Sequence, residues 1–176
     1  MLPSALQDEA ARLLEAFRSR RIRIATAESC TGGLIAALLT EIPGSSDVLE
    51  RGFVAYSNAA KIEMLGVPAD LIATHGGVSE AVARAMAEGA LRASQAHVSI
   101  AVTGVAGPGG CSAAKPVGLV HLAAAHKGEA TLHRECRFGD IGRDLVRQRC
   151  VEVGLALLRQ ALGQAEGHAS GAAAAP

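Results

Sequence analysis

Residues 22–39 read IRIATAESCTGGLIAALL. The first six of them, Ile22 to Ala27, form an apolar run that predicts a buried strand. Apolar residues then recur at helical spacing, so a helix is predicted over residues 30–41. Ser29 therefore lies where a strand turns into a helix, and the first backbone N–H groups of a helix have no partner within it. A serine at such a turn is the first candidate nucleophile.

Helices and strands alternate on both sides of this stretch. An apolar stripe that includes Leu13 and Phe17 predicts a first helix from Ser4 to the basic cluster at residues 18–21. Beyond residue 46 the pattern predicts strands over 50–57, 97–103, 118–126 and 129–138, and helices over 58–65, 69–74, 78–94 and 142–162. Ser79 is the expected N-cap of helix 78–94.

This order of elements predicts the fold class. Early alternation followed by a late hairpin favours an α/β protein, with one three-layer α/β/α domain on a mixed, mostly parallel sheet and a C-terminal hairpin. The domain is expected to span residues 1–162. Residues 163–176 are rich in Gly, Ala and Ser without an apolar face, so a disordered tail is predicted there.

The composition excludes several classes of protein. A length of 176 residues with 49% hydrophobic residues is typical of one globular domain. No apolar run approaches the roughly 20 residues of a membrane span, and charged residues interrupt the N-terminus early, so we expect a cytoplasmic protein with no membrane partner. The 17 basic residues balance 17 acidic ones, and the aromatic residues are three Phe and one Tyr. We therefore expect small anionic ligands and no nucleic-acid partner.

Metal and disulfide chemistry have no signature in this sequence. The four cysteines, at positions 30, 111, 136 and 150, form no Cys-x-x-Cys pair, and the six histidines show no metal-ligand spacing. Reduced thiols, no metal and no cofactor are expected. Cys30, next to Ser29, is interpreted as a small buried residue.

Ser29 has two interpretations. One is the N-cap of the following helix, a common role of serine. The other is a nucleophile in a ligand site, because Thr31, Gly32 and Gly33 follow it. Glycines let a ligand approach the backbone closely, and a helix N-terminus favours negative charge, so the same N–H groups could bind an oxyanion or a phosphate. No histidine stands in a triad context, and the Ser-x-x-Lys motif is missing.

Lys61 and Tyr56 are the candidate partners of this serine. Lys61 follows a predicted strand that should neighbour the strand before Ser29, so its amine could reach the hydroxyl. Desolvation can lower a lysine pKa enough for the amine to act as a base. A solvated helix lysine is the competing interpretation. Tyr56 ends the same predicted strand, and either its hydroxyl points into the cleft or the ring only packs.

A Gly-rich loop over residues 104–110 follows the predicted strand at 97–103. It is not a Walker loop, because Gly110 stands where the lysine should be, and it lacks the dinucleotide fingerprint. One interpretation is a flexible turn between strands. We favour a ligand-facing loop, because open α/β sheets bind ligands at the carboxyl ends of their strands. Thr103 and Ser112 would be its polar contacts.

Five blocks of this sequence resemble the CinA C-terminal-domain family, the nicotinamide-nucleotide amidohydrolases. They are TAESCTGG at 26–33, RGFVAYSNAAK at 51–61, GGVSE at 76–80, TGVAGP at 103–108 and KPVG at 115–118. They occur in the family's order, and the resemblance spans roughly residues 5 to 162. It implies the stand-alone form of the domain, without the larger N-terminal domain of longer CinA proteins.

The resemblance implies a reaction and a set of roles. Enzymes of this family hydrolyse the carboxamide of nicotinamide mononucleotide to nicotinic acid mononucleotide and ammonia, without a metal or cofactor, in pyridine-nucleotide recycling. Carried over, Ser29 is the nucleophile, Lys61 its general base and Tyr56 a hydroxyl that assists proton transfer. Arg143 matches an arginine suited to the nucleotide phosphate, and Thr103 and Gly104 match the contact at the strand end. A homo-oligomer, dimer or larger, is also implied.

Two hypotheses of different classes follow. The first is an amidase that acts on a small-molecule nucleotide. The second is a catalytically silent nucleotide-binding protein, or an interaction protein linked to competence or DNA damage, on the same fold. The joint presence of Ser29, Tyr56 and Lys61 favours the enzyme.

Overall fold

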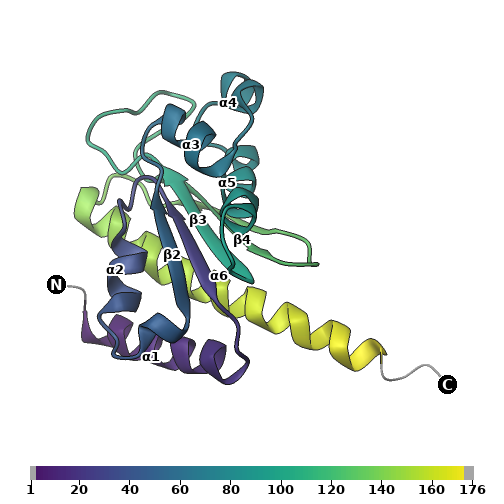
Figure 1. The fold of residues 1–176 in the computed structure, drawn as a ribbon. Coiled ribbons are helices and arrows are strands. Elements are labelled where there is room, and N and C mark those ends of the chain that lie inside the picture. Colours follow the sequence, from purple (N-terminus) through teal and green to yellow (C-terminus); the bar gives the residue numbers. More distant parts are fainter. Residues whose placement is uncertain (1–2, 173–176) are drawn as a thin grey trace.

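A five-stranded mixed sheet forms the centre of the protein (Figure 1). The computed structural model describes residues 3–172, and of residues 165–172 it describes the backbone only. The strand order is β2-β1-β3-β4-β5, and the strands are β1 (Ile24–Glu28), β2 (Leu49–Val54), β3 (Val98–Gly104), β4 (Leu119–His126) and β5 (Leu132–Arg137). The pairs β2–β1 and β1–β3 are parallel, and β3–β4 and β4–β5 are antiparallel. The mixed sheet with a C-terminal hairpin is confirmed.

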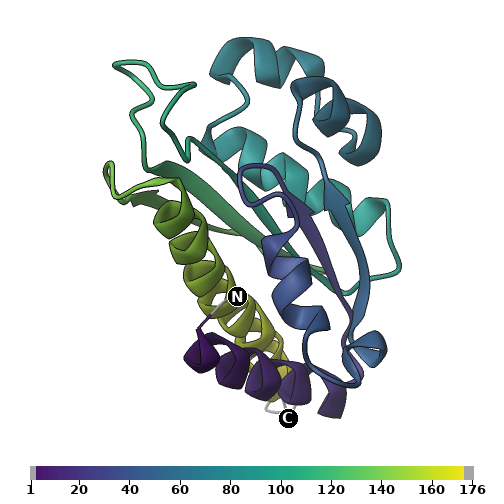
Figure 2. The same cartoon turned by 90° about the vertical axis from the view of Figure 1, so that its left-hand side faces the viewer.

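Helices cover both faces of the sheet, which confirms three layers. On one face lie α2 (Leu34–Thr40) and α6 (Arg143–Ala172), with α1 (Ser4–Ser19) packed against both (Figure 2). On the other face α5 (Glu80–Arg92) packs against β1, β3 and β4. Two short helices, α3 (Asn58–Leu65) and α4 (Ala69–His75), lie near the carboxyl ends of the parallel strands (Figure 1). A one-turn 3₁₀ helix (Ser45–Asp47) precedes β2.

The two faces of the sheet are packed with side chains of different size. The face toward α1, α2 and α6 carries large residues such as Ile24, Ile100 and Leu122. The face toward α5 is rich in alanine, including Ala27 and Ala101. All five residues of β1 are buried, because helices cover both faces of the sheet, and apart from Thr26 and Glu28 they are apolar.

The connections between the strands define where a fold of this kind binds its ligand. From β1 the chain crosses through α2 to β2 on one side, and it then returns through α3, α4 and α5 to β3 on the other side. The direction of winding therefore reverses between β1 and β3. Open α/β sheets bind ligands at such a switch point, outside the carboxyl ends of the strands. Here these ends are Glu28 of β1 and Gly104 of β3.

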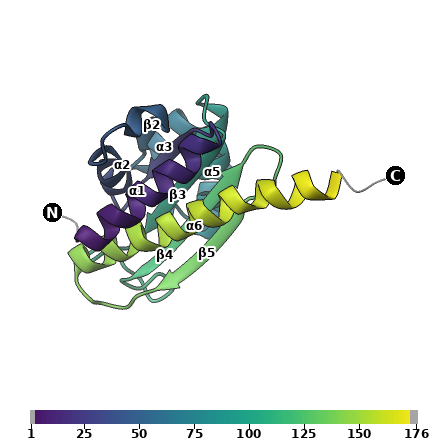
Figure 3. The same ribbon diagram turned by 90° about the horizontal axis from the view of Figure 1, so that it is seen from below.

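The two largest differences from the predicted boundaries are in α2 and α6, and β2 also ends at Val54 rather than at residue 57, which leaves Tyr56 just outside the strand. Helix α2 begins at Leu34 rather than near residue 30, because Gly32 and Gly33 adopt positive φ angles of 62° and 94° and keep the chain in a turn. Helix α6 continues to Ala172 instead of ending at Leu162, so the expected tail is helical up to that residue and extends past the sheet (Figure 3). No proline interrupts this segment, and its Ala, Gln and Glu residues favour helix. Residues 173–176 of the predicted tail lie outside the described residues.

None of the helices within residues 3–172 combines the length and the apolar character that a membrane crossing requires.

Candidate active site

Ser29 is the first residue after β1, and backbone hydrogen bonds hold it on both sides. Its N–H donates to the carbonyl of Val102 on β3 over 2.9 Å, and its own carbonyl accepts from the N–H of Gly32 over 3.0 Å. The residue is 8% exposed. The nucleophile candidate is therefore fixed at the switch point between β1 and β3, as its place in the sequence predicts.

Glu28, the last residue of β1, closes the turn that follows. Its two carboxylate oxygens accept hydrogen bonds from the N–H groups of Ile35 and Ala36, over 3.0 and 2.9 Å, in the first turn of α2. The N-cap residue Gly33 has no side chain for this purpose. A negative charge at a helix N-terminus is favourable, so the protein's own carboxylate occupies the place where an anionic ligand was expected.

The sequence predicts ligand contacts at Thr31, Gly32 and Gly33, in the turn that Glu28 closes. None of these three residues lines the cavity described below. The carbonyl of Thr31 accepts from Arg147 of α6, and its hydroxyl is buried without a partner. The N-cap interpretation of Ser29 is also not met, because the cap of α2 is Gly33 and the capping carboxylate comes from Glu28.

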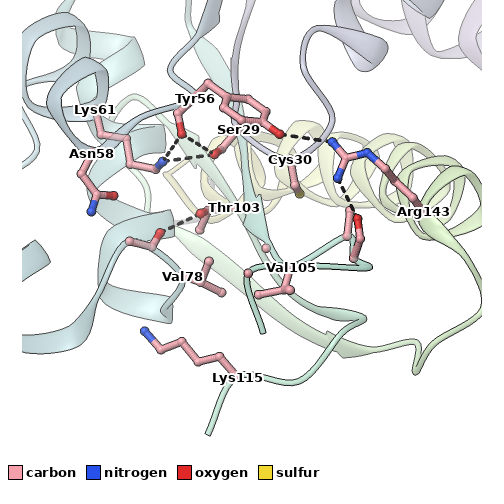
Figure 4. A pocket seen from close by; sticks show the side chains of 16 residues that line it. Ser29, Cys30, Tyr56, Asn58, Lys61, Val78, Thr103, Val105, Lys115 and Arg143 are labelled. Atoms are coloured by element: carbon pink, nitrogen blue, oxygen red, sulfur yellow. Dashed lines mark hydrogen bonds between the residues drawn. The ribbon is translucent and has the colours of Figure 1, made fainter. Parts of the chain in front are cut away.

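Lys61 projects from α3 toward Ser29. Its side chain is buried, and its Nζ lies 3.1 Å from the Oγ of Ser29 and 3.2 Å from the carbonyl oxygen of Tyr56 (Figure 4). Ser57 caps α3 by accepting from the N–H of Ala60, which fixes the start of the helix that carries the lysine. Burial lowers the pKa of Lys61 below its ordinary value, and the charge of a Cys30 thiolate opposes the shift. The solvated-lysine interpretation is therefore wrong.

Tyr56 makes two separate sets of contacts in the site, one through its backbone carbonyl and one through its side-chain hydroxyl. Its carbonyl oxygen accepts from Lys61 Nζ and, over 3.4 Å, from Ser29 Oγ. Its ring is 58% exposed, and its hydroxyl accepts from Arg143 over 3.1 Å. A packing tyrosine is therefore excluded, but the hydroxyl contacts Arg143 rather than Ser29 or Lys61.

Arg143 is the first residue of α6 and borders the mouth of the cavity. Besides the bond to Tyr56, its guanidinium donates to the carbonyl of Gly107 over 2.9 Å. It thus joins β2's end to the loop after β3 (Figure 4). The arginine predicted for the phosphate does line the cavity, with two of its donors directed at neutral protein oxygens.

A cavity of about 360 Å³ lies in front of Ser29, within the size range of sites for small ligands. Its walls come from the turn after β1, from α3, from the loop before α5, from the end of β3 and the following loop, and from α6. The residues that line it are Ser29, Cys30, Tyr56, Asn58, Lys61, Gly77, Val78, Thr103, Gly104, Val105, Ala106, Gly107, Gly109, Gly110, Lys115 and Arg143.

The predicted strand-end contacts belong to this cavity. Thr103 and Gly104 line it, but the hydroxyl of Thr103 donates to the carbonyl of Gly77 over 2.7 Å and so ties the loop before α5 to β3. The Gly-rich loop does face the cavity, as the ligand-facing interpretation predicted. Ser112, expected as a polar contact of that loop, does not line it.

Reasoning from the sequence did not single out two polar residues of the cavity. Asn58 lies on α3, and Lys115 enters from the loop between β3 and β4. Both belong to blocks of the family resemblance, but no spacing rule connects either of them with Ser29. Within the lining, the basic side chains are Lys61, Lys115 and Arg143, with no carboxylate among them. A cavity of this charge attracts anions, although the whole chain is neutral.

Cys30 is buried below Ser29, as expected from the sequence. Its thiol is hydrogen-bonded with that of Cys150 on α6, which lowers the pKa of Cys30 and raises that of Cys150. Among the side chains that the structure describes, no group of three or more His, Cys, Asp or Glu is arranged to hold a metal ion. The contact between Ser29 and Lys61 offers the chemistry of a serine hydroxyl beside a desolvated amine.

Known proteins are similar to this chain in sequence and in fold. The profile of the CinA C-terminal domain matches residues 6–162. A CinA-like protein of Anaeromyxobacter dehalogenans is 55% identical over 145 residues, which cover 82% of this chain and 35% of the relative. The nicotinamide-nucleotide amidohydrolase PncC of Escherichia coli K12 is 45% identical over 161 residues, which cover 91% of this chain and 96% of PncC. The chain thus spans about a third of the CinA-like relatives and nearly all of PncC.

Solved structures agree with this result. The competence/damage inducible protein CihA from Agrobacterium tumefaciens matches with a TM-score of 0.90 at 50% identity, covering 93% of this chain and 98% of that one. A CinA superfamily protein from Escherichia coli matches with a TM-score of 0.84 at 32% identity, covering 91% and 93%. The profile covers most of the chain, and the fold agrees along nearly its full length. The chain belongs to the CinA C-terminal domain family.

Proposed function

We propose that the protein hydrolyses the carboxamide of nicotinamide mononucleotide to nicotinic acid mononucleotide and ammonia. The observation that carries this proposal is the 3.1 Å contact between Ser29 Oγ and the buried amine of Lys61, at the closed end of a cationic cavity. The similarity to PncC, an amidohydrolase of nicotinamide nucleotides, supports the choice of substrate.

The proposed reaction has two stages. Neutral Lys61 accepts the proton of Ser29 while Oγ attacks the carboxamide carbon, and the resulting ammonium then protonates the amide nitrogen, which leaves as ammonia. Water attacks the acyl ester in the second stage, with Lys61 again taking and returning one proton. The balance is one amide and one water converted to one carboxylic acid and one ammonia.

Other residues are proposed to position Ser29, Lys61 and the substrate. The carbonyl of Tyr56 contacts both Ser29 and Lys61, so it orients the pair. For the Tyr56 hydroxyl to assist proton transfer, it must exchange its Arg143 partner for the substrate. Thr103, Gly104 and Arg143 are proposed substrate contacts, because they line the cavity. A cytoplasmic homo-oligomer in pyridine-nucleotide recycling remains part of the proposal.

Ammonia release from nicotinamide mononucleotide tests the function. The native chain should form ammonia and nicotinic acid mononucleotide in equal amounts, and Ser29→Ala should form neither at a comparable rate while keeping the native circular dichroism. A native chain that binds the nucleotide but releases no ammonia would instead support the silent nucleotide-binding protein.

A further inference from the structure

Two neighbouring glycines form a wall beside the cavity, and of the two it is Gly77 that lines it. They lie in a block of the sequence that the proposed reaction does not use. Gly76 and Gly77 lie between α4 and α5. The carbonyl of Gly76 accepts from the hydroxyl of Ser79 over 3.1 Å, and that of Gly77 accepts from Thr103 over 2.7 Å. The wall is therefore fixed by two side-chain hydrogen bonds, one from the cap of α5 and one from β3.

These glycines leave room for two polar side chains of the cavity. A Cβ atom on Gly76 would collide with the Nζ of Lys115, and one on Gly77 would collide with the side-chain amide of Asn58. Gly76 also has a φ of 72°, which few other residues adopt. The wall thus lacks side chains at the two places where Lys115 and Asn58 reach the cavity.

Lys115 is itself held in position. Its backbone N–H donates to the carbonyl of Ser112, and its carbonyl accepts from the N–H of the same residue, which closes a turn of the loop. Its ammonium donates to the carbonyl of His75, the last residue of α4, over 2.6 Å. An ammonium has three N–H donors, and this partner is a neutral carbonyl, so the charge is not neutralised by a carboxylate.

The three basic side chains of the cavity have different surroundings. The amine of Lys61 contacts the hydroxyl of Ser29 and is the base of the proposed reaction. Arg143 is exposed, and its guanidinium already donates to Tyr56 and Gly107. Lys115 is half-buried and enters on the side of the cavity away from Arg143 (Figure 4). The anionic end of a substrate with its amide at Ser29 therefore meets different donors on the two sides of the cavity, Lys115 on one side and Arg143 on the other.

We propose that Lys115 is a specificity-determining residue that binds the phosphate of the nucleotide, in a subsite lined by Gly77 and bordered by Gly76. This inference rests on the proposed function for the identity of the anion. It reassigns the phosphate contact, which the family resemblance gave to Arg143, and it leaves Arg143 to hold Tyr56 at the mouth of the cavity.

Binding measurements in the Ser29→Ala background test this assignment. The dissociation constants of nicotinamide mononucleotide and of nicotinamide riboside, which lacks the phosphate, are measured by calorimetry, and their ratio gives the phosphate preference. Adding Lys115→Ala should reduce that preference by about 10- to 100-fold, the value of one charge-assisted hydrogen bond. Adding Arg143→Ala should weaken both ligands to a similar extent. Lys127→Ala is the matched control, since Lys127 is exposed at the opposite end of β4 and has the same charge.

The outcomes separate the inference from the function. An unchanged preference with Lys115→Ala, or a preference lost with Arg143→Ala, overturns the assignment. If Lys115→Ala does not fold, Lys115→Gln keeps the stem of the side chain and removes the charge, with the same expectation. Ammonia release by the native chain is measured in parallel. A native chain that releases no ammonia counts against the proposed function. A native chain that releases ammonia, together with an unchanged phosphate preference in the Lys115→Ala variant, counts against this inference alone.

Discussion

At the scale of single residues, the site depends on the removal of one lysine from water. Lys61 is 3% exposed and faces a hydroxyl and a carbonyl, and no carboxylate among the described side chains is in hydrogen-bond contact with its amine. A buried ammonium without a carboxylate partner is costly, so the neutral amine is favoured. A neutral amine is the form that can accept a proton from Ser29.

The pH dependence of the rate follows from this environment. Because the base must be neutral, kcat/KM should rise with pH along a limb whose midpoint lies below 10.5, the ordinary value for lysine. Rates measured between about pH 6 and about pH 10 at constant ionic strength check this expectation. A midpoint at or above the ordinary pKa of lysine would mean that Lys61 is not the desolvated base.

At the scale of elements, the sequence predicts the strand, the turn and the helix around Ser29, but not how the turn is closed. The apolar run identifies β1, and the helical spacing of apolar residues identifies α2. Both patterns arise because buried positions carry apolar side chains, and both can be seen among residues that are close in the sequence. The carboxylate of Glu28 reaches forward to Ile35 and Ala36, and no local rule for capping covers a residue that lies at the end of a strand. The same limit applies to Lys115, whose approach to Gly76 depends on how two distant loops meet.

The contact between α5 and α3 provides a test of packing at this scale. Alanine at Gly89 would gain up to about 1 kcal/mol in helix propensity. Its Cβ would collide with the carbonyl oxygen of Leu65, the last residue of α3. Because backbone cannot give way cheaply, Gly89→Ala should lower the free energy of unfolding by about 1–3 kcal/mol.

Gly163→Ala is the matched control for this change. Gly163 also lies within a helix, α6, but a Cβ there meets no atom within 4 Å. It should leave the stability unchanged or raise it by up to about 1 kcal/mol. Urea denaturation of both variants measures the difference, and equal stabilities for the two would show that the contact with Leu65 is not tight.

At the scale of the whole molecule, the fold was predictable because its topology follows from the order of elements. The crossover from β1 to β2 and the crossover from β2 back past β1 to β3 run in opposite directions, and the site forms where the carboxyl ends of β1 and β3 lie side by side. The alternation of helices and strands in the sequence predicts this arrangement. The periodic pattern does not predict that Glu28 occupies the N-terminus of α2, because this depends on a contact between two elements. It also does not predict that α6 extends to Ala172, because this depends on helix propensity rather than on an apolar face.

Buried histidines couple the stability of the molecule to pH. His121 and His133, on β4 and β5, form a hydrogen bond of 3.1 Å, which requires one of the rings to be neutral. Burial lowers the pKa of His121, His133 and His126 below 6.5. The unfolded chain therefore binds more protons than the folded chain in the range below pH 6.5, so the free energy of unfolding should decrease as the pH falls through that range.

Urea denaturation on either side of this range checks the expectation. His121→Gln should reduce the pH dependence, because it removes one of the groups whose pKa is shifted. His75→Gln, at an exposed position on α4, is the control and should leave the pH dependence unchanged. Stability that is constant from neutral pH down to about pH 5 would contradict the neutral state of these rings.

The central claim is that Ser29 and Lys61 act as one catalytic unit. The most direct measurement compares the rate of ammonia release from nicotinamide mononucleotide for the native chain, Ser29→Ala, Lys61→Met and the double variant. Each single change should lower kcat by at least about 100-fold while the thermal transition remains cooperative, and the double variant should be no slower than the slower single variant. A folded single variant that keeps a rate close to the native one, or losses that multiply in the double variant, would contradict the claim.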